Sequence, residues 1–240
     1  MTSPPTLPLL GLIVPPHAGD VPSDGPTLYG ERARFSARGL GLGEISTRGY
    51  EAVIDHVVAL AEALARDGAQ AVSLMGTSLS FFRGARFTDE LAAAMAAATG
   101  LPCTTMSHAI VRALRALGLR KVAAATAYID DVNDRLAAYL IASDIEPTAV
   151  EGLAITGVAE VGAVPTAALV ALCERVYRAR PDSDGILISC GGLQTLDAIA
   201  IVERRLGVPV VSSSPAGFWD LMRVAGLDSR APAGGRLFES

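Results

Sequence analysis

Short apolar runs alternate along the chain with longer stretches in which apolar residues recur every three or four positions. Apolar runs of this length are typical of buried strands, and the periodic stretches are typical of helices that cover a sheet. Strands are predicted at 7–14, 69–75, 102–106, 121–125, 146–153, 185–189 and 209–212. Helices are predicted at 47–67, 88–98, 107–117, 129–143, 165–179 and 193–206. This alternation predicts an α/β fold built on parallel sheets.

The first predicted helix carries its own start and stop signals. Ser46 or Thr47 can cap its N-terminus, and Gly68 follows its last residue. Its apolar residues have helical spacing and predict a single buried stripe. The stripe consists of Tyr50, Val53, Ile54, Val57, Leu60, Ala61 and Leu64.

Parallel segments in the two parts of the chain predict an internal duplication. Residues 100–109 parallel residues 207–216, and the strand at 7–16 corresponds to the segment at 121–128. We therefore predict two similar, doubly wound parallel-sheet halves whose strand carboxyl ends face one central cleft. The first half is expected to comprise residues 1–117 plus about 213–240, because a helix near 218–224 can return to it, and the second half residues 118–212.

One pair of duplicated strand ends is chemically unequal. The segments 71–79 and 185–193 are both apolar strands that run into a turn, and aligning Leu79 with Leu193 places Gly76 opposite Cys190. Active groups of open α/β sheets gather at strand carboxyl ends. A thiol on only one of two facing strand ends can deliver a proton to only one face of a bound molecule. The pattern thus predicts one-sided proton transfer by Cys190.

Composition and charge exclude several classes of partner. Half of the 240 residues are hydrophobic, 19% are charged, and the net charge is −5 with no basic cluster, which argues against nucleic acid and anionic membranes. No apolar run is long enough to span a membrane, and the apolar start is interpreted as a strand and not as a signal peptide. Three widely spaced cysteines form no disulfide framework, so we expect a cytoplasmic protein.

Cofactor sites also lack their usual residues. The only lysine, Lys121, begins a strand, whereas a Schiff-base lysine is expected at a strand carboxyl end. The glycines of 39–43 suggest a dinucleotide fingerprint, but Glu44 and Ser46 occupy both positions where its third glycine would fall. Metal ligation is not indicated, because the sequence has no Cys-x-x-Cys and no ligand spacing among His17, His56 and His108. We therefore expect no cofactor and no metal.

Segments through most of the chain together resemble the aspartate/glutamate racemase superfamily and, within it, the arylmalonate decarboxylase family. They are residues 11–16, 39–43, 72–81, 126–133, 155–158, 187–193 and 211–219. Racemases of this superfamily carry one cysteine in each half, whereas the decarboxylases keep only the second. Gly76 opposite Cys190 matches the decarboxylases.

The resemblance implies cofactor-free, enantioselective decarboxylation of α-aryl, α-alkyl malonates to 2-arylpropionates of the (R) form. Loss of carbon dioxide leaves a planar enediolate, which needs positioned hydrogen-bond donors. It also implies that Cys190 protonates this intermediate. The implied substrate-binding groups are Thr77, Ser78, Tyr128, Gly191, Gly192, Gly76 and Pro16, and the implied hydrophobic pocket is Leu42, Ile45, Tyr50, Leu79, Val158 and Val161. The expected partner is a small dicarboxylate, and the resemblance favours a monomer.

Each assignment has an alternative. Thr77 and Ser78 could cap a helix, Tyr128 could be packing, and Cys103 and Cys173 are interpreted as core residues. At the level of the whole protein, one alternative is a racemase or cis-trans isomerase of the same superfamily that uses a single cysteine and a second base. Another is a non-catalytic protein that binds small acids in a cleft between two lobes.

Overall fold

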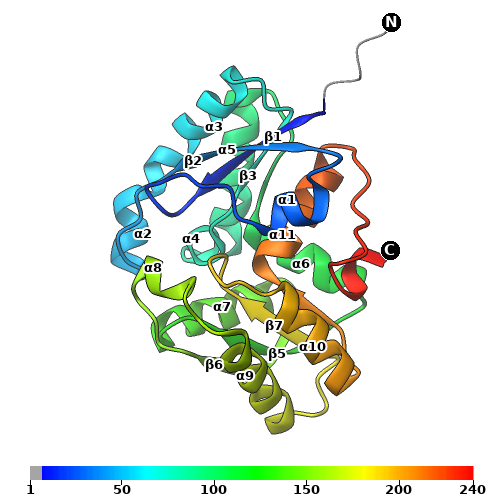
Figure 1. Ribbon diagram of the computed structural model, residues 1–240. Coiled ribbons are helices and arrows are strands. Elements are labelled where there is room, and N and C mark those ends of the chain that lie inside the picture. Colours follow the sequence, from blue (N-terminus) through cyan, green and yellow to red (C-terminus); the bar gives the residue numbers. More distant parts are fainter. Residues whose placement is uncertain (1–6, 240) are drawn as a thin grey trace, which may run out of the picture.

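The computed structural model describes residues 7–239, so residues 1–6 and 240, which the predicted first half includes, lie outside the described part. Two four-stranded parallel sheets form the fold, with strand orders β2-β1-β3-β4 and β6-β5-β7-β8 (Figure 1). The first sheet contains β1 (Leu9–Val14), β2 (Arg34–Gly39), β3 (Ala71–Leu74) and β4 (Cys103–Thr105). The second contains β5 (Lys121–Thr126), β6 (Glu146–Gly152), β7 (Gly185–Ser189) and β8 (Val210–Ser212). The predicted α/β class with two similar parallel sheets is confirmed.

Helices follow the strands of each sheet. Those that precede β5 in the chain are α1 (Asp24–Tyr29), α2 (Thr47–Val53), the 3-10 turn η1 (Ile54–His56), α3 (Val57–Arg66), α4 (Thr77–Phe81), α5 (Ala85–Thr99) and α6 (Met106–Ala116). The remaining helices are α7 (Asp130–Ala142), α8 (Val158–Val161), α9 (Thr166–Ala179), α10 (Leu196–Leu206), α11 (Ser213–Val224) and η2 (Arg236–Glu239). The strand orders match position by position, so β1 corresponds to β5, β3 to β7 and β4 to β8, as the duplication predicted.

Several element boundaries differ from the sequence prediction. The helix predicted at 47–67 is divided by η1 into α2 and α3, although its buried stripe is present and Ser46 caps it by accepting a hydrogen bond from the Gly49 N–H. Strand β2 was not predicted, because it is a half-exposed edge strand with no continuous apolar run. Helices α1, α4 and α8 were also not predicted, and they are shorter than the windows over which helical periodicity can be recognised.

Helix α11 begins at Ser213, not near Phe218 as predicted. Pro215 lies in its first turn, where a missing N–H costs no helical hydrogen bond. The helix packs on α6, α1 and β4, and the buried Asp220 carboxylate accepts hydrogen bonds from Arg112 at 2.8 Å and from Thr104 at 2.6 Å. Because α11 also contacts β7 and β8, its assignment to the first half stays a prediction.

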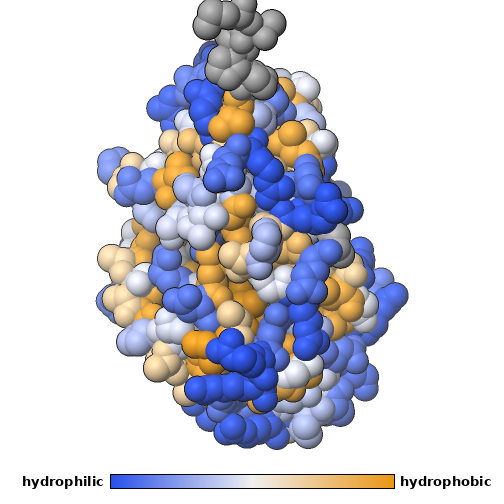
Figure 2. Space-filling view, turned by 45° about the vertical axis from the view of Figure 1, so that its right-hand side comes forward, coloured by the Kyte–Doolittle hydropathy of each residue, from blue (hydrophilic) through white to orange (hydrophobic). Residues whose placement is uncertain are grey.

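The buried apolar side chains form one continuous cluster that includes residues of both sheets. Figure 2 shows hydrophobic side chains gathered in the middle of one face, with hydrophilic regions above and below them. Within residues 7–239, no helix is both long and apolar enough to cross a membrane.

Candidate active site

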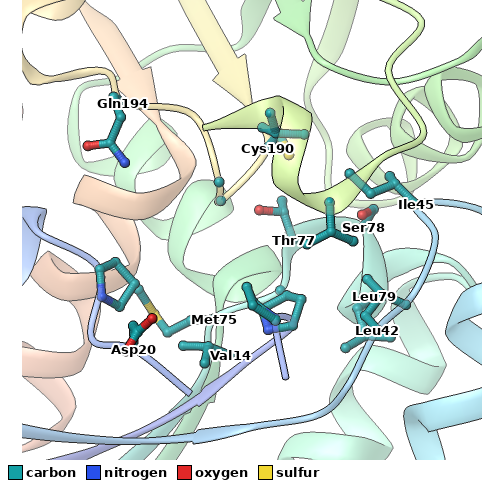
Figure 3. Close-up of a pocket in the computed structure, with 18 of the residues that line it drawn as sticks. Val14, Asp20, Leu42, Ile45, Met75, Thr77, Ser78, Leu79, Cys190 and Gln194 are labelled. Atoms are coloured by element: carbon teal, nitrogen blue, oxygen red, sulfur yellow. The ribbon is translucent and has the colours of Figure 1, made fainter. Parts of the chain in front are cut away.

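A cavity of about 340 Å³ lies where strand ends and loops of the two halves meet (Figure 3). Many of the residues that line it were predicted: Pro16, Leu42, Ile45, Gly76, Thr77, Ser78, Leu79, Val158, Val161, Cys190, Gly191 and Gly192. The others were not: Val14, Pro15, Asp20, Val21, Pro22, Ser23, Met75 and Gln194. The structure thus brings together residues from strand ends far apart in the sequence.

Backbone hydrogen bonds hold the loop after β2 against the cavity. The Leu42 N–H donates to the Pro15 carbonyl at 2.8 Å, and the Ile45 N–H donates to the Thr156 carbonyl at 2.9 Å. The first bond ties this loop to the loop after β1, and the second ties it to the second half. A Cβ atom on Gly39 would collide with the Pro16 carbonyl, so this close approach requires glycine. The loop at 39–43 is thereby held in place, and its residue Leu42 lines the cavity.

Cys190 follows β7 and is 7% exposed. Burial raises the pKa of its thiol to about 11, while the Gly192 backbone N–H and the Tyr128 hydroxyl, which stabilise the thiolate, limit the rise. The thiol is therefore protonated at neutral pH, and two donors are in place to stabilise the thiolate that forms when it gives up its proton. This combination suits a proton donor better than a permanently ionised nucleophile.

The opposite strand end places hydroxyl and N–H groups on the cavity. Gly76 precedes α4, and Thr77 and Ser78 form the first turn of that helix, where backbone N–H groups lack helical partners. The Thr77 carbonyl accepts hydrogen bonds from Ser80 at 2.9 Å and from Ser107 at 3.0 Å. These buried bonds fix the turn between β3 and α4.

The two strand ends approach each other closely. A Cβ atom on Gly191 would lie 2.9 Å from the Met106 sulfur and 3.2 Å from the Met75 carbonyl oxygen. A larger residue at 191 would therefore displace the Met106 side chain and crowd the Met75 carbonyl, which directly precedes Gly76. Gly191 was expected only as a substrate-binding group, and the structure adds a packing reason for glycine at this position.

Two predicted site residues do not line the cavity. Tyr50 and Tyr128 are almost fully buried behind its surface. The Tyr50 hydroxyl donates to Ser78 Oγ at 2.8 Å, and the Tyr128 hydroxyl accepts from Ser189 at 3.3 Å while lying within hydrogen-bonding reach of Cys190 and Ser78. Burial raises the pKa of both phenols, so they remain protonated donors. Sequence spacing could not separate residues on the cavity surface from residues directly beneath it.

Sequence analysis missed the segment from Asp20 to Ser23 and the residue Gln194. The segment follows β1 and Gln194 follows β7, and the carboxyl ends of both strands reach the cleft. The strand-end rule that identified Cys190 applies equally to these loops and could have indicated them. Among the described residues, no group of three or more His, Cys, Asp or Glu side chains is arranged to hold a metal ion.

Comparisons with known proteins find one family model and two kinds of relative. A family model described as arylmalonate decarboxylase matches residues 10–238. An arylmalonate decarboxylase from Bordetella bronchiseptica is 61% identical over 233 residues, which are 97% of this chain and 97% of that protein. A maleate isomerase from Nocardia farcinica is 30% identical over 130 residues, 54% of this chain and 51% of that protein.

Solved structures show the same relationship. A liganded arylmalonate decarboxylase mutant, with one glycine changed to cysteine and one cysteine to serine, is 61% identical. It has a TM-score of 0.95 over 97% of this chain and 100% of that chain. The maleate isomerase Iso from Pseudomonas putida S16 has a TM-score of 0.90 at 21% identity, over 97% of this chain and 98% of that chain, and shares the fold.

Proposed function

The chain belongs to the arylmalonate decarboxylase family and is a carboxy-lyase acting on small arylmalonates, and we propose that its central cleft performs the reaction with Cys190 as the proton donor. The role of Cys190 as proton donor rests on one observation. Cys190 is the only thiol on the cavity surface that the structure describes, and Gly76 occupies the corresponding position of the other half.

The retained carboxylate binds between the two strand ends. The Ser78 hydroxyl and the backbone N–H groups at the start of α4 and at Gly191 are available to its oxygens. The Thr77 hydroxyl donates to the Met106 sulfur at 2.7 Å and turns from it to the carboxylate when substrate binds. When the bond from the α-carbon to the second carboxylate breaks, its electron pair remains on the α-carbon and spreads into the retained carboxylate, giving an enediolate. Positioned donors stabilise the charge that accumulates on these oxygens. Tyr50 and Tyr128 act from behind, by orienting Ser78 and Cys190.

The departing carboxylate occupies the apolar side of the cavity. Leu42, Ile45 and Leu79 lie together there, at the opposite end from Asp20 and Gln194 (Figure 3). Val158 and Val161 also line the cavity. A carboxylate in apolar surroundings loses hydration, and leaving as neutral carbon dioxide relieves that cost. The aryl group then extends toward the other end of the cavity.

Cys190 completes the reaction from one side. Its S–H proton passes to the α-carbon, the enediolate becomes the 2-arylpropionate, and the thiolate is reprotonated from solvent. Because no thiol or other acid occupies Gly76, the opposite face of the planar intermediate receives no proton from the protein. The product is therefore a single enantiomer, and by family resemblance it is the (R) form.

Release of carbon dioxide from phenylmalonate tests this function directly. We expect turnover by the native protein, and we expect Cys190→Ser to reduce it at least about a hundredfold, because a serine hydroxyl is a far weaker acid. Cys103→Ser and Cys173→Ser are matched controls, since neither residue lines the cavity, and both should retain activity. Near-normal turnover by Cys190→Ser would remove Cys190 from the mechanism. A single-cysteine isomerase or a binding protein would release no carbon dioxide.

A monomeric state and a cytoplasmic location complete the proposal as predictions. The described cysteines are all free thiols, which supports a reducing compartment. Size-exclusion chromatography with light scattering would test the oligomeric state.

A further inference from the structure

Polar side chains gather at one end of the otherwise largely apolar cavity. Asp20 and Gln194 lie at the end opposite to Leu42, Ile45 and Leu79 (Figure 3). Asp20 belongs to the loop after β1, and Gln194 to the turn after β7. The aryl ring of a substrate points toward this end when its malonate group lies against Cys190.

The polar end is held by a hydrogen bond between the two halves of the chain. Ser23 Oγ donates to Gln194 Oε1 at 3.0 Å, so the loop after β1 is tied to the turn that follows Cys190. This bond uses the amide oxygen of Gln194. It keeps the loop that carries Asp20 at the mouth of the cavity.

The Asp20 carboxylate has no partner of its own. Within residues 7–239 it forms no hydrogen bond and no ion pair. It is also the one charged group among the described residues that line the cavity. A carboxylate accepts hydrogen bonds but donates none, so it favours a donor or a cation and disfavours a further anion.

We propose that Asp20 selects arylmalonates whose ring carries a cationic or hydrogen-bond-donating group remote from the malonate, over rings that carry an anionic group. This inference rests on the proposed function, because it places the malonate group at Cys190. The preference is modest, since Asp20 is exposed to solvent, and an exposed charge pair changes an equilibrium by only about three- to fivefold.

Six ring-substituted phenylmalonates of similar size, three at each of two ring positions, test the proposal. They carry an aminomethyl, an ethyl or a carboxylate group, each at the para and the meta position. Carbon dioxide release gives kcat/KM for each substrate, and the measured quantity is the ratio of aminomethyl to ethyl substrate. Comparing this ratio between protein variants cancels the electronic effect of the substituent on the carbanion.

We expect Asp20→Asn to lower the aminomethyl-to-ethyl ratio about three- to fivefold and to raise the relative rate of the carboxylate substrate. High salt should lower the ratio in the native protein, because the interaction is exposed and screened. Asp134→Asn is the matched control, because Asp134 is an exposed aspartate of α7 that does not line the cavity. It changes net charge equally and should leave the ratio unchanged.

Equal ratios in the native protein and Asp20→Asn, at both ring positions, would overturn the proposal. So would an equal shift in Asp134→Asn, which would indicate a general effect of net charge. Turnover of unsubstituted phenylmalonate distinguishes failure of the proposed function from failure of the proposed role of Asp20. If the native protein fails to decarboxylate phenylmalonate, the proposed function fails. If it succeeds while the ratios are insensitive to Asp20, only the role of Asp20 fails.

Discussion

A second thiol at Gly76 would test whether the two strand ends face the same carbon. Gly76 has φ −127° and ψ 100°, an extended conformation that any residue adopts, so Gly76→Cys introduces no backbone strain. An added Cβ would lie 3.1 Å from Leu79 Cβ, 3.2 Å from Leu79 Cδ2 and 3.2 Å from Pro15 Cγ. These neighbours must move by a few tenths of an ångström.

The cost of this crowding is small enough for the variant to fold. Overpacking of a buried site costs about 1–3 kcal/mol, and for a chain of this size each kcal/mol lowers Tm by about 2–4 °C. We therefore expect Gly76→Cys to unfold a few degrees below the native protein. Gly76→Ala adds the same Cβ without a thiol and is the matched steric control.

With thiols on both sides, the enediolate can be protonated on either face. Decarboxylation of α-methyl-α-phenylmalonate by Gly76→Cys should therefore give product of reduced enantiomeric purity, whereas Gly76→Ala should still give one enantiomer. The same Cys variant should slowly racemise a pure 2-arylpropionate, because one thiolate removes the α-proton and the other thiol returns one. Combining Gly76→Cys with Cys190→Ser should reverse the handedness of the product.

Chiral chromatography of the product and α-proton exchange in heavy water, followed by NMR, measure these outcomes. A Gly76→Cys protein that is folded and active, and that still gives one pure enantiomer without exchange, would refute the facing arrangement of the two strand ends. Loss of purity in Gly76→Ala as well would show that crowding, and not the second thiol, changes the selectivity.

Further changes address the oxyanion contacts, the thiol and the packing of α11. Tyr128→Phe and Thr77→Ala should each slow turnover of phenylmalonate about a hundredfold, because one donor to the enediolate oxygens or to the thiolate contributes roughly 3 kcal/mol; altered stability with unchanged kinetics would contradict this. In a variant whose other two cysteines are serines, the rate of alkylation of Cys190 by iodoacetamide should rise with pH through about 11, because burial raises the thiol pKa. A rise centred near 8.5 would instead show an unperturbed thiol. Arg112→Met removes the cation beside the buried Asp220 carboxylate and should lower the free energy of unfolding by about 2 kcal/mol, as measured by thermal denaturation. This loss is smaller than for a fully buried ion pair, because the arginine is half exposed.

The order of amino acids by itself determined the sheets and the asymmetry of the cleft. Buried parallel strands are typically nearly continuous apolar runs, and such runs were readable at β1, β3, β5, β7 and β8. Because parallel strands end at the same edge of a sheet, the difference between Gly76 and Cys190 at matched strand ends already indicated one-sided chemistry. The half-exposed edge strand β2 lacks this pattern and was not recognised.

Only the tertiary structure decided which side chains face the cavity and which lie behind it. Tyr50 and Tyr128 were expected on the surface of the site, but both are buried beneath Ser78 and Cys190. The loop after β1 could be expected near the cleft, but its contact with the other half, through a hydrogen bond between Ser23 and Gln194, which are 171 positions apart, could not. Local sequence sets the strands and helices through short-range periodicity, whereas the depth of a side chain depends on contacts between distant segments. Those contacts leave no periodic pattern along the chain.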